Sequence, residues 1–122
     1  MDAHNISDKR RDVRYEILDY AMVYDSAESE PVRCVIVDIG LGGLQLRSRD
    51  ELAVGGTCLM NIGNLDTSPI RIRGEVRHSQ KVKGSELFAS GIRFIPETPE
   101  ERTTVASYVH SVFQRQADLL FP

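Results

Sequence analysis

Apolar and polar residues alternate with a period of two over much of the chain. In the clearest segment, residues 70–78, Ile70, Ile72 and Val76 share one face, and charged side chains occupy the other. This alternation predicts strands with one buried face. Gly74, on the inner face, indicates a bulge or a close approach of the backbone. Further strands are expected at residues 15–24, 32–37, 44–47, 58–62 and 86–94.

The pattern changes to a helical period near the C-terminus. Thr98 is a suitable N-cap, Pro99 suits the first helical position, and Glu101 completes a capping box. The apolar residues that then recur at helical spacing, and that should pack on the sheet, are Val105, Tyr108, Val109, Val112 and Phe113. Several strands, glycine turns and one closing helix predict a mainly β fold, a small antiparallel barrel with a helix packed against it.

The length of 122 residues indicates a single domain. Residues 1–14 are expected to form a flexible N-terminal arm, residues 15–96 the barrel, and residues 97–118 the helix. No apolar run reaches the roughly 18–20 residues of a membrane-spanning helix, and the N-terminus lacks the basic and apolar parts of a secretory signal. A cytoplasmic protein without membrane insertion is therefore expected.

Sequence motifs of enzyme chemistry and metal binding are missing. Cys34 and Cys58 lie within apolar runs and form no Cys-x-x-Cys pair, so buried, reduced thiols are expected. The three histidines are scattered, and none neighbours a cysteine at ligand spacing. With no nucleophile elbow, P-loop or paired cysteine and histidine, we expect no catalytic residues, no metal site and no cofactor.

Positive charge is concentrated near the N-terminus of an otherwise acidic chain. The net charge of −3 at pH 7 argues against a nucleic-acid polymer as partner, because such proteins need a broadly basic face. Yet Lys9, Arg10, Arg11 and Arg14 fall within a short segment. One basic arm on an acidic protein fits a small anionic ligand better than a long polyanion.

Arg10 and Arg14 are four residues apart, a spacing that puts both side chains on one side of a strand or of a helix. Each guanidinium offers paired donors that match a phosphate or the O6/N7 edge of guanine. Arg11 could replace Arg10 as an accessory ligand-binding residue. The segment alone also fits a solvated basic arm that pairs internally with Asp12 and Glu16.

The second candidate site is residues 38–43, with the sequence DIGLGG, which follow a buried strand. The Asp38 carboxylate can accept hydrogen bonds from the N1–H and N2–H₂ groups of guanine, and Gly43 lets a base or a phosphate approach the backbone. Gly40, Gly42 and Gly43 permit positive φ, so a turn is expected here. Local evidence also fits an ordinary turn capped by Asp38.

These two segments resemble the RxxxR and (D/N)xSxxG signatures of PilZ domains, a family of bacterial receptors for the dinucleotide cyclic di-GMP. Residues 91–94, with the sequence GIRF, are similar to the family's late G-x-R-F strand, and the family commonly ends in a helix packed on its barrel. The resemblance extends over residues 9–115. It implies a six-stranded antiparallel β-barrel and a single PilZ domain at residues 9–118.

The resemblance also implies the ligand and the residues that hold it. Arg10 and Arg14 would grip the guanine and phosphate groups of cyclic di-GMP, and Asp38 and Gly43 would contact a guanine from the barrel side. Gly40 belongs to the same site but stands where the family usually has serine. The missing hydroxyl removes one neutral hydrogen bond of roughly 0.5–1.5 kcal/mol, so affinity should fall about tenfold at most. The two charge-assisted arginine contacts outweigh that loss.

A receptor of this kind is expected to signal through a bacterial protein partner in motility, pilus or polysaccharide machinery, after ligand phosphates fold the arm onto the barrel. One alternative is a PilZ-like barrel that binds no nucleotide and acts only through protein contacts, which Gly40 favours. Another is a small-barrel RNA binder, which is disfavoured because Tyr15 is the only aromatic residue near the arginines. Arg71, Arg73 and Arg77 are expected to form a solvated stripe or, alternatively, a partner-docking face.

Overall fold

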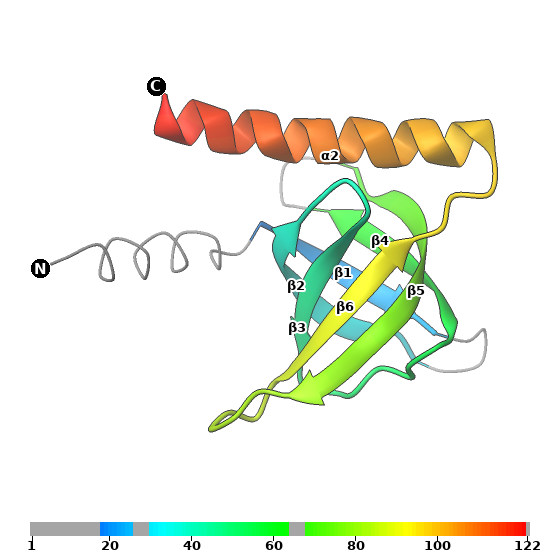
Figure 1. Cartoon of the computed structure of the whole chain (residues 1–122), viewed down its shortest axis with the longest axis vertical. Helices are drawn as coiled ribbons and strands as arrows, with labels where there is room; N and C mark the ends of the chain where they lie inside the picture. Colours follow the sequence, from blue (N-terminus) through cyan, green and yellow to red (C-terminus); the bar gives the residue numbers. More distant parts are fainter. Residues whose placement is uncertain (1–17, 26–29, 64–67, 122) are drawn as a thin grey trace, which may run out of the picture.

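The computed structural model describes residues 18–25, 30–63 and 68–121, which form a closed barrel with a helix across one end (Figure 1). The elements are β1 (Asp19–Tyr24), β2 (Val32–Ile39), β3 (Gly43–Ser48), β4 (Thr57–Gly63), β5 (Ile70–Lys81), β6 (Phe88–Phe94) and α2 (Pro99–Leu120). Neighbouring strands are antiparallel, in the order β1-β2-β3-β6-β5-β4 around the barrel. The predicted six-stranded barrel with a C-terminal helix is confirmed. The predicted arm, residues 1–14, lies outside the described residues.

Inward-facing apolar side chains from the six strands meet in one core, as the alternation predicts. Leu44 and Leu46 of β3 are buried, as are Ile72 and Val76 of β5. Ile70, at the start of β5, is only partly buried but packs against the same core. The barrel interior is therefore filled with side chains and holds no ligand channel of the kind found in larger barrels.

Pairing carries two strands beyond their predicted ends. β2 continues through Ile39, so Asp38 belongs to the strand and not to the turn, because Asp38 pairs with Gln45 of β3. β5 runs to Lys81, well past the predicted end at residue 78, because its last residues pair with the start of β6. A backbone ladder needs no side-chain alternation, so it can extend into polar sequence.

The start of β6 differs from the prediction, and the predicted start of β1 cannot be compared. β6 starts at Phe88 and not at Glu86, because residues 82–87 form the connecting loop, in which the Val82 N–H donates a hydrogen bond to the Leu87 carbonyl oxygen at 2.8 Å. β1 starts at Asp19, and residues 15–17 of its predicted range lie outside the described residues. Hairpin loops therefore take residues that their apolar content alone assigns to strands.

Gly74 marks a close approach of the backbone, as expected. A Cβ there would overlap the Ile92 side chain and lie 3.1 Å from the Arg93 carbonyl oxygen and 3.2 Å from Met60 Cε. The bulge in β5 lies further along, between Val76 and His78. Gly74 thus lets β6 and the core side chains pack tightly over β5.

Helix α2 begins as predicted. Thr98 is the N-cap, and its hydroxyl oxygen accepts a hydrogen bond from the Glu101 backbone N–H at 3.1 Å. Pro99 opens the helix, and two acidic residues lie in its first turn, where they complement the helix dipole. α2 is not apolar enough to cross a membrane.

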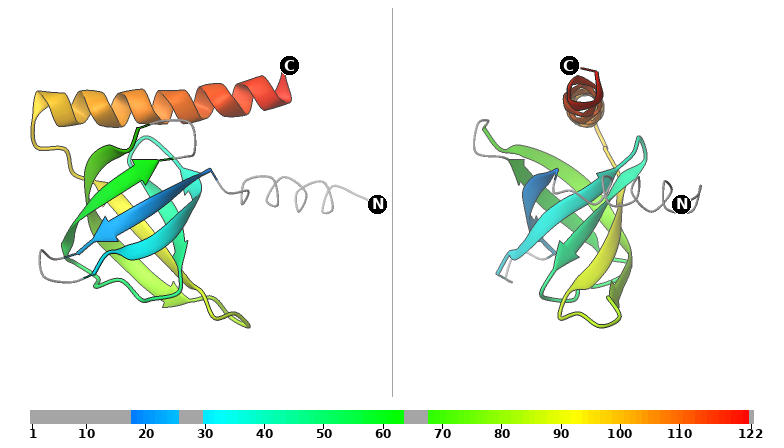
Figure 2. Two further views of the ribbon diagram at one scale, coloured as in Figure 1. Left: turned by 180° about the vertical axis from the view of Figure 1, so that it is seen from behind. Right: turned by 90° about the vertical axis from the view of Figure 1, so that its left-hand side faces the viewer.

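The apolar stripe of α2 covers one end of the barrel, as the end-on view of the helix in Figure 2 shows. Val105, Tyr108, Val109 and Val112 are buried there. Phe113, predicted to belong to the stripe, is 46% exposed. Val112 already occupies the contact with the barrel, and the next residue lies about 100° further round the helix. The C-terminal end of α2 extends beyond the barrel, and Leu119, Leu120 and Phe121 are exposed (Figure 1).

Ion pairs tie the start of α2 to β5. Arg73 Nε donates a hydrogen bond to Glu101 Oε1 at 3.1 Å and lies 3.8 Å from Glu97. The hydrogen bond to Glu101 raises the pKa of Arg73 and lowers the pKa of Glu101. Arg73 is therefore not part of the predicted stripe of solvated arginines, because its side chain pairs with Glu101 of the helix.

A buried carboxylate ties the far part of α2 to β1. Asp19 is only 2% exposed, and its Oδ2 accepts a hydrogen bond from the Tyr108 hydroxyl at 2.6 Å. The Arg115 guanidinium donates to both carboxylate oxygens, at 3.2 and 2.9 Å. Burial and the nearby Asp19 carboxylate raise the pKa of the Tyr108 phenol, so it remains a donor. This network lies where the chain enters the barrel, since Arg115 also contacts the Leu18 carbonyl oxygen at 3.4 Å.

Cys34 and Cys58 are buried and form no disulfide, as predicted. Burial raises the pKa of the Cys34 thiol to about 12 and that of the Cys58 thiol to about 11. Both thiols are therefore protonated at neutral pH and act as small apolar side chains of the core.

Candidate ligand-binding site

The glycine turn between β2 and β3 is closed by hydrogen bonds to itself and to β6. The Gly40 N–H donates to the Gly43 carbonyl oxygen at 2.8 Å, and the Phe94 N–H donates to the Gly42 carbonyl oxygen at 2.9 Å. Before the turn, Asp38 Oδ1 accepts a hydrogen bond from the Ile39 N–H at 2.9 Å. The carboxylate is therefore held at the mouth of the turn, next to the β2 bulge between Ile36 and Asp38.

Gly43 is needed for close packing. A Cβ there would overlap the Ile92 carbonyl oxygen and lie 3.2 Å from Arg93 Cα, its partner on β6. Among the described residues, only Gly55 and Gly84 are glycines with positive φ. The predicted turn between β2 and β3 is present, but its glycines do not use the positive φ that they permit, and the close approach of two strands explains Gly43.

Gly40 and Gly42 have more room. A Cβ on Gly40 would have the Gly43 carbonyl oxygen, 4.0 Å away, as its nearest neighbour, and a Cβ on Gly42 would meet no atom within 4 Å. Neither glycine is required by packing. The residue at position 40 can therefore be exchanged without disturbing the turn.

The turn forms one wall of a shallow cleft of about 370 Å³. Strands β3, β5 and β6 supply the floor and the other wall. The polar and glycine residues that line the cleft are Asp38, Gly40, Gly42, Gly43, Gln45, Arg77, His78, Gly91 and Arg93. The structure thus brings together Asp38, Gly40 and Gly43, the three predicted site residues that it describes.

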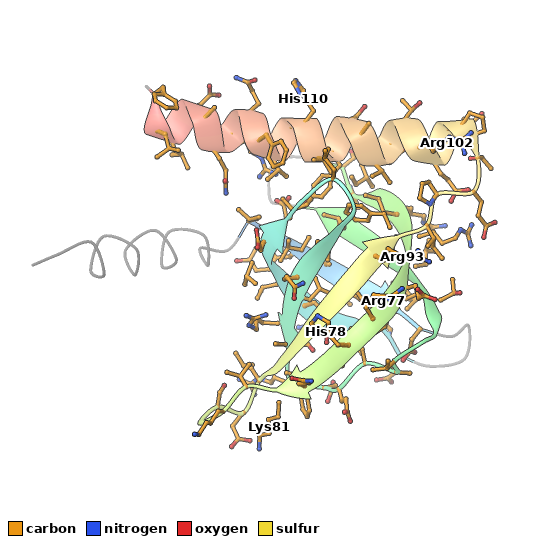
Figure 3. The ribbon with its side chains drawn as sticks, in the orientation of Figure 1. Arg77, His78, Lys81, Arg93, Arg102 and His110 are labelled. Atoms are coloured by element: carbon orange, nitrogen blue, oxygen red, sulfur yellow. The ribbon has the colours of Figure 1, made fainter. Side chains whose placement is uncertain are left out.

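Charges in the described part of the cleft balance. Glu75 Oε1 lies 3.3 Å from Arg77 Nη1 and 3.3 Å from Arg93 Nη2, so one carboxylate holds two half-exposed guanidiniums (Figure 3). With Asp38, two carboxylates face two arginines. An anion with two phosphates would therefore need further positive charge, and the basic segment of the chain at residues 9–14 carries it.

The predicted arginines Arg10, Arg11 and Arg14 lie outside the described residues. The described chain begins at Leu18, whose N–H donates to the Ile36 carbonyl oxygen at 2.8 Å, two residues before Asp38 in β2. β1 and β2 are antiparallel, and Asp19, the first residue of β1, pairs with Ile36. Arg14 is four residues before Leu18, a span of about 14 Å at most in extended chain.

Sequence reasoning missed Arg77, His78 and Arg93 as residues of the cleft. Arg77 belonged to the expected solvated stripe, and its ion pair with Glu75 turns it towards the cleft. Arg93 stood in the GIRF segment without a role. The available signal was the loss of alternation at Arg77-His78, where two polar residues follow each other in a strand.

Within the described ranges, no group of three His, Cys, Asp or Glu side chains is placed to hold a metal ion. The two thiols are buried in the core, away from the cleft. The side chains of the cleft are suited to binding a polar, flat or anionic ligand by hydrogen bonds, charge and ring contacts.

Comparisons with known proteins agree with this architecture. The family model for the PilZ domain matches residues 8–111. Among solved structures, the PilZ domain of YcgR from Escherichia coli, described as solved with c-di-GMP, matches with a TM-score of 0.64. The match covers 84% of this chain and 87% of that chain at 13% sequence identity, which establishes a shared fold. No curated protein matches the sequence.

Proposed function

The chain belongs to the PilZ domain family of cyclic di-GMP receptors, and from this premise we propose that it binds cyclic di-GMP in the cleft beside the glycine turn. Asp38 accepts hydrogen bonds from the edge of a guanine, and Gly43, which lines the cleft, lets β3 pack closely against β6 and so holds the turn beside the ligand. Arg10 and Arg14 hold the phosphate and guanine groups from the N-terminal side, with Arg11 as an accessory donor.

The observation that supports this proposal is that the described chain begins close to Asp38 of β2. The described chain begins at Leu18, which is hydrogen-bonded to Ile36 only two residues before Asp38. The cleft itself is charge-balanced, so it lacks the positive charge that a ligand with two phosphates requires. The adjacent basic segment supplies that charge, and neither part alone makes a complete site.

Ligand binding would order the arm against the barrel. Phosphates neutralise the clustered arginines and hold them beside Asp38, and the new surface is read by a bacterial protein partner. Ordering about ten backbone residues costs on the order of 10 kcal/mol, so several good contacts must form together. Salt should weaken the binding because much of it is ionic.

Calorimetric titration of cyclic di-GMP is expected to give micromolar or tighter binding, and the Arg10→Ala/Arg14→Ala double variant should lose it. Two charge-assisted contacts of roughly 1.5–3 kcal/mol each correspond to a loss of about 10²–10⁴-fold. A matched double variant, Arg71→Ala/Arg102→Ala, removes the same charge from exposed positions outside the cleft. Equal losses of affinity in both double variants would show that the arm acts only through its net charge and makes no specific contact with the ligand.

Gly40→Ser is expected to strengthen binding. The position has room for a side chain, and a serine hydroxyl there adds one neutral hydrogen bond to the ligand. The gain should be about 2–10-fold in the dissociation constant. Gly42→Ser, at the neighbouring open position, is the control and should give no gain. A Gly40→Ser variant that binds cyclic di-GMP no more tightly than the wild type would show that a hydroxyl at position 40 makes no hydrogen bond to the ligand.

The alternative is a barrel that binds no nucleotide and acts only through protein contacts. Gly40 favours it, and the end of α2 offers a surface for it, because Phe113, Leu119, Leu120 and Phe121 are exposed. The same titration decides between the two functions. If the folded protein gives no heat of binding with cyclic di-GMP, the protein acts only through protein contacts.

A further inference from the structure

The bulge in β5 presents two consecutive side chains on the outside of the barrel. Val76 pairs with Ile92, and His78 pairs with Gly91, so Arg77 is the extra residue between them. In a regular strand Arg77 and His78 would point to opposite faces. Here both are exposed and both line the cleft. Bulges redirect side chains in this way and are frequent beside functional sites.

The position of the His78 ring depends on Gly91. A Cβ on Gly91 would overlap His78 Nε2 and lie 2.9 Å from both Cδ2 and Cε1. Three ring atoms are therefore close to one backbone position, which means that the imidazole lies over the bare backbone of Gly91. The glycine of the GIRF segment, Gly91, is explained by this contact, since any side chain there would displace the ring.

The ring stands among groups that can hold a nucleotide. Gly91 pairs with His78 on one side and with Gln45 on the other, so His78, Gly91 and Gln45 form a row across three strands. The row faces the same cleft as Asp38 and the arginines on Glu75. Figure 3 shows Arg77, His78 and Arg93 on the same side of the barrel. A flat, supported ring beside polar side chains is a suitable platform for a base.

We propose that His78 binds the ligand by stacking its imidazole on a purine base, and that Gly91 is the positioning residue that holds the ring in place. This inference rests on the proposed function and adds an aromatic contact to a site otherwise made of carboxylate, guanidinium and backbone groups. Stacking tolerates different bases, because each has a π-face, so His78 contributes affinity while Asp38 reads the guanine edge.

The first test compares dissociation constants for cyclic di-GMP by calorimetry. His78→Ala should weaken binding about 5–100-fold, the range expected for one base stacked on an aromatic side chain. His78→Phe keeps a ring without its nitrogens and should stay within about threefold of the wild type. His110→Ala removes an exposed histidine of α2 and should change nothing. Equal affinities of His78→Ala and the wild type would overturn the stacking role.

The second test is a double-mutant cycle on Gly91. Gly91→Ala pushes against a ring that can move, so the fold should survive, as thermal melting can check. It should weaken ligand binding when His78 is present and have no effect in the His78→Ala background. Equal losses in both backgrounds would show that Gly91 acts through the barrel and not through the ring.

A spectroscopic signal separates this inference from the proposed function. On saturation with cyclic di-GMP, the ring Cε1–H resonance of His78 should shift, whereas that of His110 should not. Wild-type binding without a shift at His78 would overturn the stacking role and leave the receptor function intact. A wild type that binds no cyclic di-GMP would overturn both.

Discussion

Gly43→Ala is expected to lower the free energy of unfolding by about 1–3 kcal/mol or more, the range for side chains forced into a packed site. The added Cβ would overlap the Ile92 carbonyl oxygen and lie 3.1 Å from the Ile92 carbonyl carbon. Both atoms are backbone, so no side-chain rotation can relieve the clash. β3 must move away from β6 where Gly43 pairs with Arg93, and the glycine turn moves with it.

Thermal denaturation measures this effect, and the midpoint should fall by roughly 4–12 °C. Gly42→Ala is the matched control, because a Cβ there meets no atom within 4 Å. It makes the same chemical change one residue away and should leave the midpoint close to that of the wild type. If Gly43→Ala and Gly42→Ala had the same midpoint of thermal denaturation, the close approach of β3 and β6 would not constrain the residue at position 43 in solution.

Arg115→Ala is expected to lower the free energy of unfolding by about 2–3 kcal/mol, because it removes a guanidinium that donates two hydrogen bonds to the buried carboxylate of Asp19. Asp19 is 2% exposed, and the guanidinium donates to both of its oxygens. Breaking a fully buried pair costs about 3–5 kcal/mol. The Arg115 side chain is 44% exposed, so water that enters its place recovers part of that loss.

Urea unfolding of three variants measures the contribution of the network. Tyr108→Phe removes one hydrogen bond to Asp19 and should cost about 1 kcal/mol, less than Arg115→Ala. Arg102→Ala, at an exposed position of the same helix, should stay within about 0.5 kcal/mol of the wild type. Arg115→Ala with wild-type stability would mean that Asp19 is solvated or otherwise neutralised when the guanidinium is absent.

The fold could be predicted from sequence because its signals are local. Alternation identified the strands, and the Thr98-Pro99 start identified the helix, since both depend on residues close together in the chain. Strand ends were less accurate, because pairing partners decide them: Asp38 is in β2 only through its partner Gln45 on β3. Phe113 was misplaced for a similar reason, as the contact with the barrel, which Val112 occupies, decides which side of the helix is covered.

The candidate site could be predicted only in part. Asp38, Gly40 and Gly43 are neighbours in sequence, so their motif brought them together without tertiary information. Arg77, His78 and Arg93 reach the same cleft through a bulge and a cross-strand ion pair, which alternation cannot reveal. The assignment of Arg10, Arg11 and Arg14 to the site stays a prediction, which the titration of the arginine variants tests.

Closure of the barrel limits how a partner protein could bind to it. β1 pairs with both β2 and β4, so each strand of the described barrel is held on two sides. A partner cannot dock by adding a strand, because no exposed sheet edge offers unpaired backbone groups. Strand sliding is equally blocked, since slippage would have to break two ladders at once. If the protein signals as proposed, the change that a partner reads would therefore lie in side chains and in segments outside the ladders, and not in the strand pairing of the described barrel.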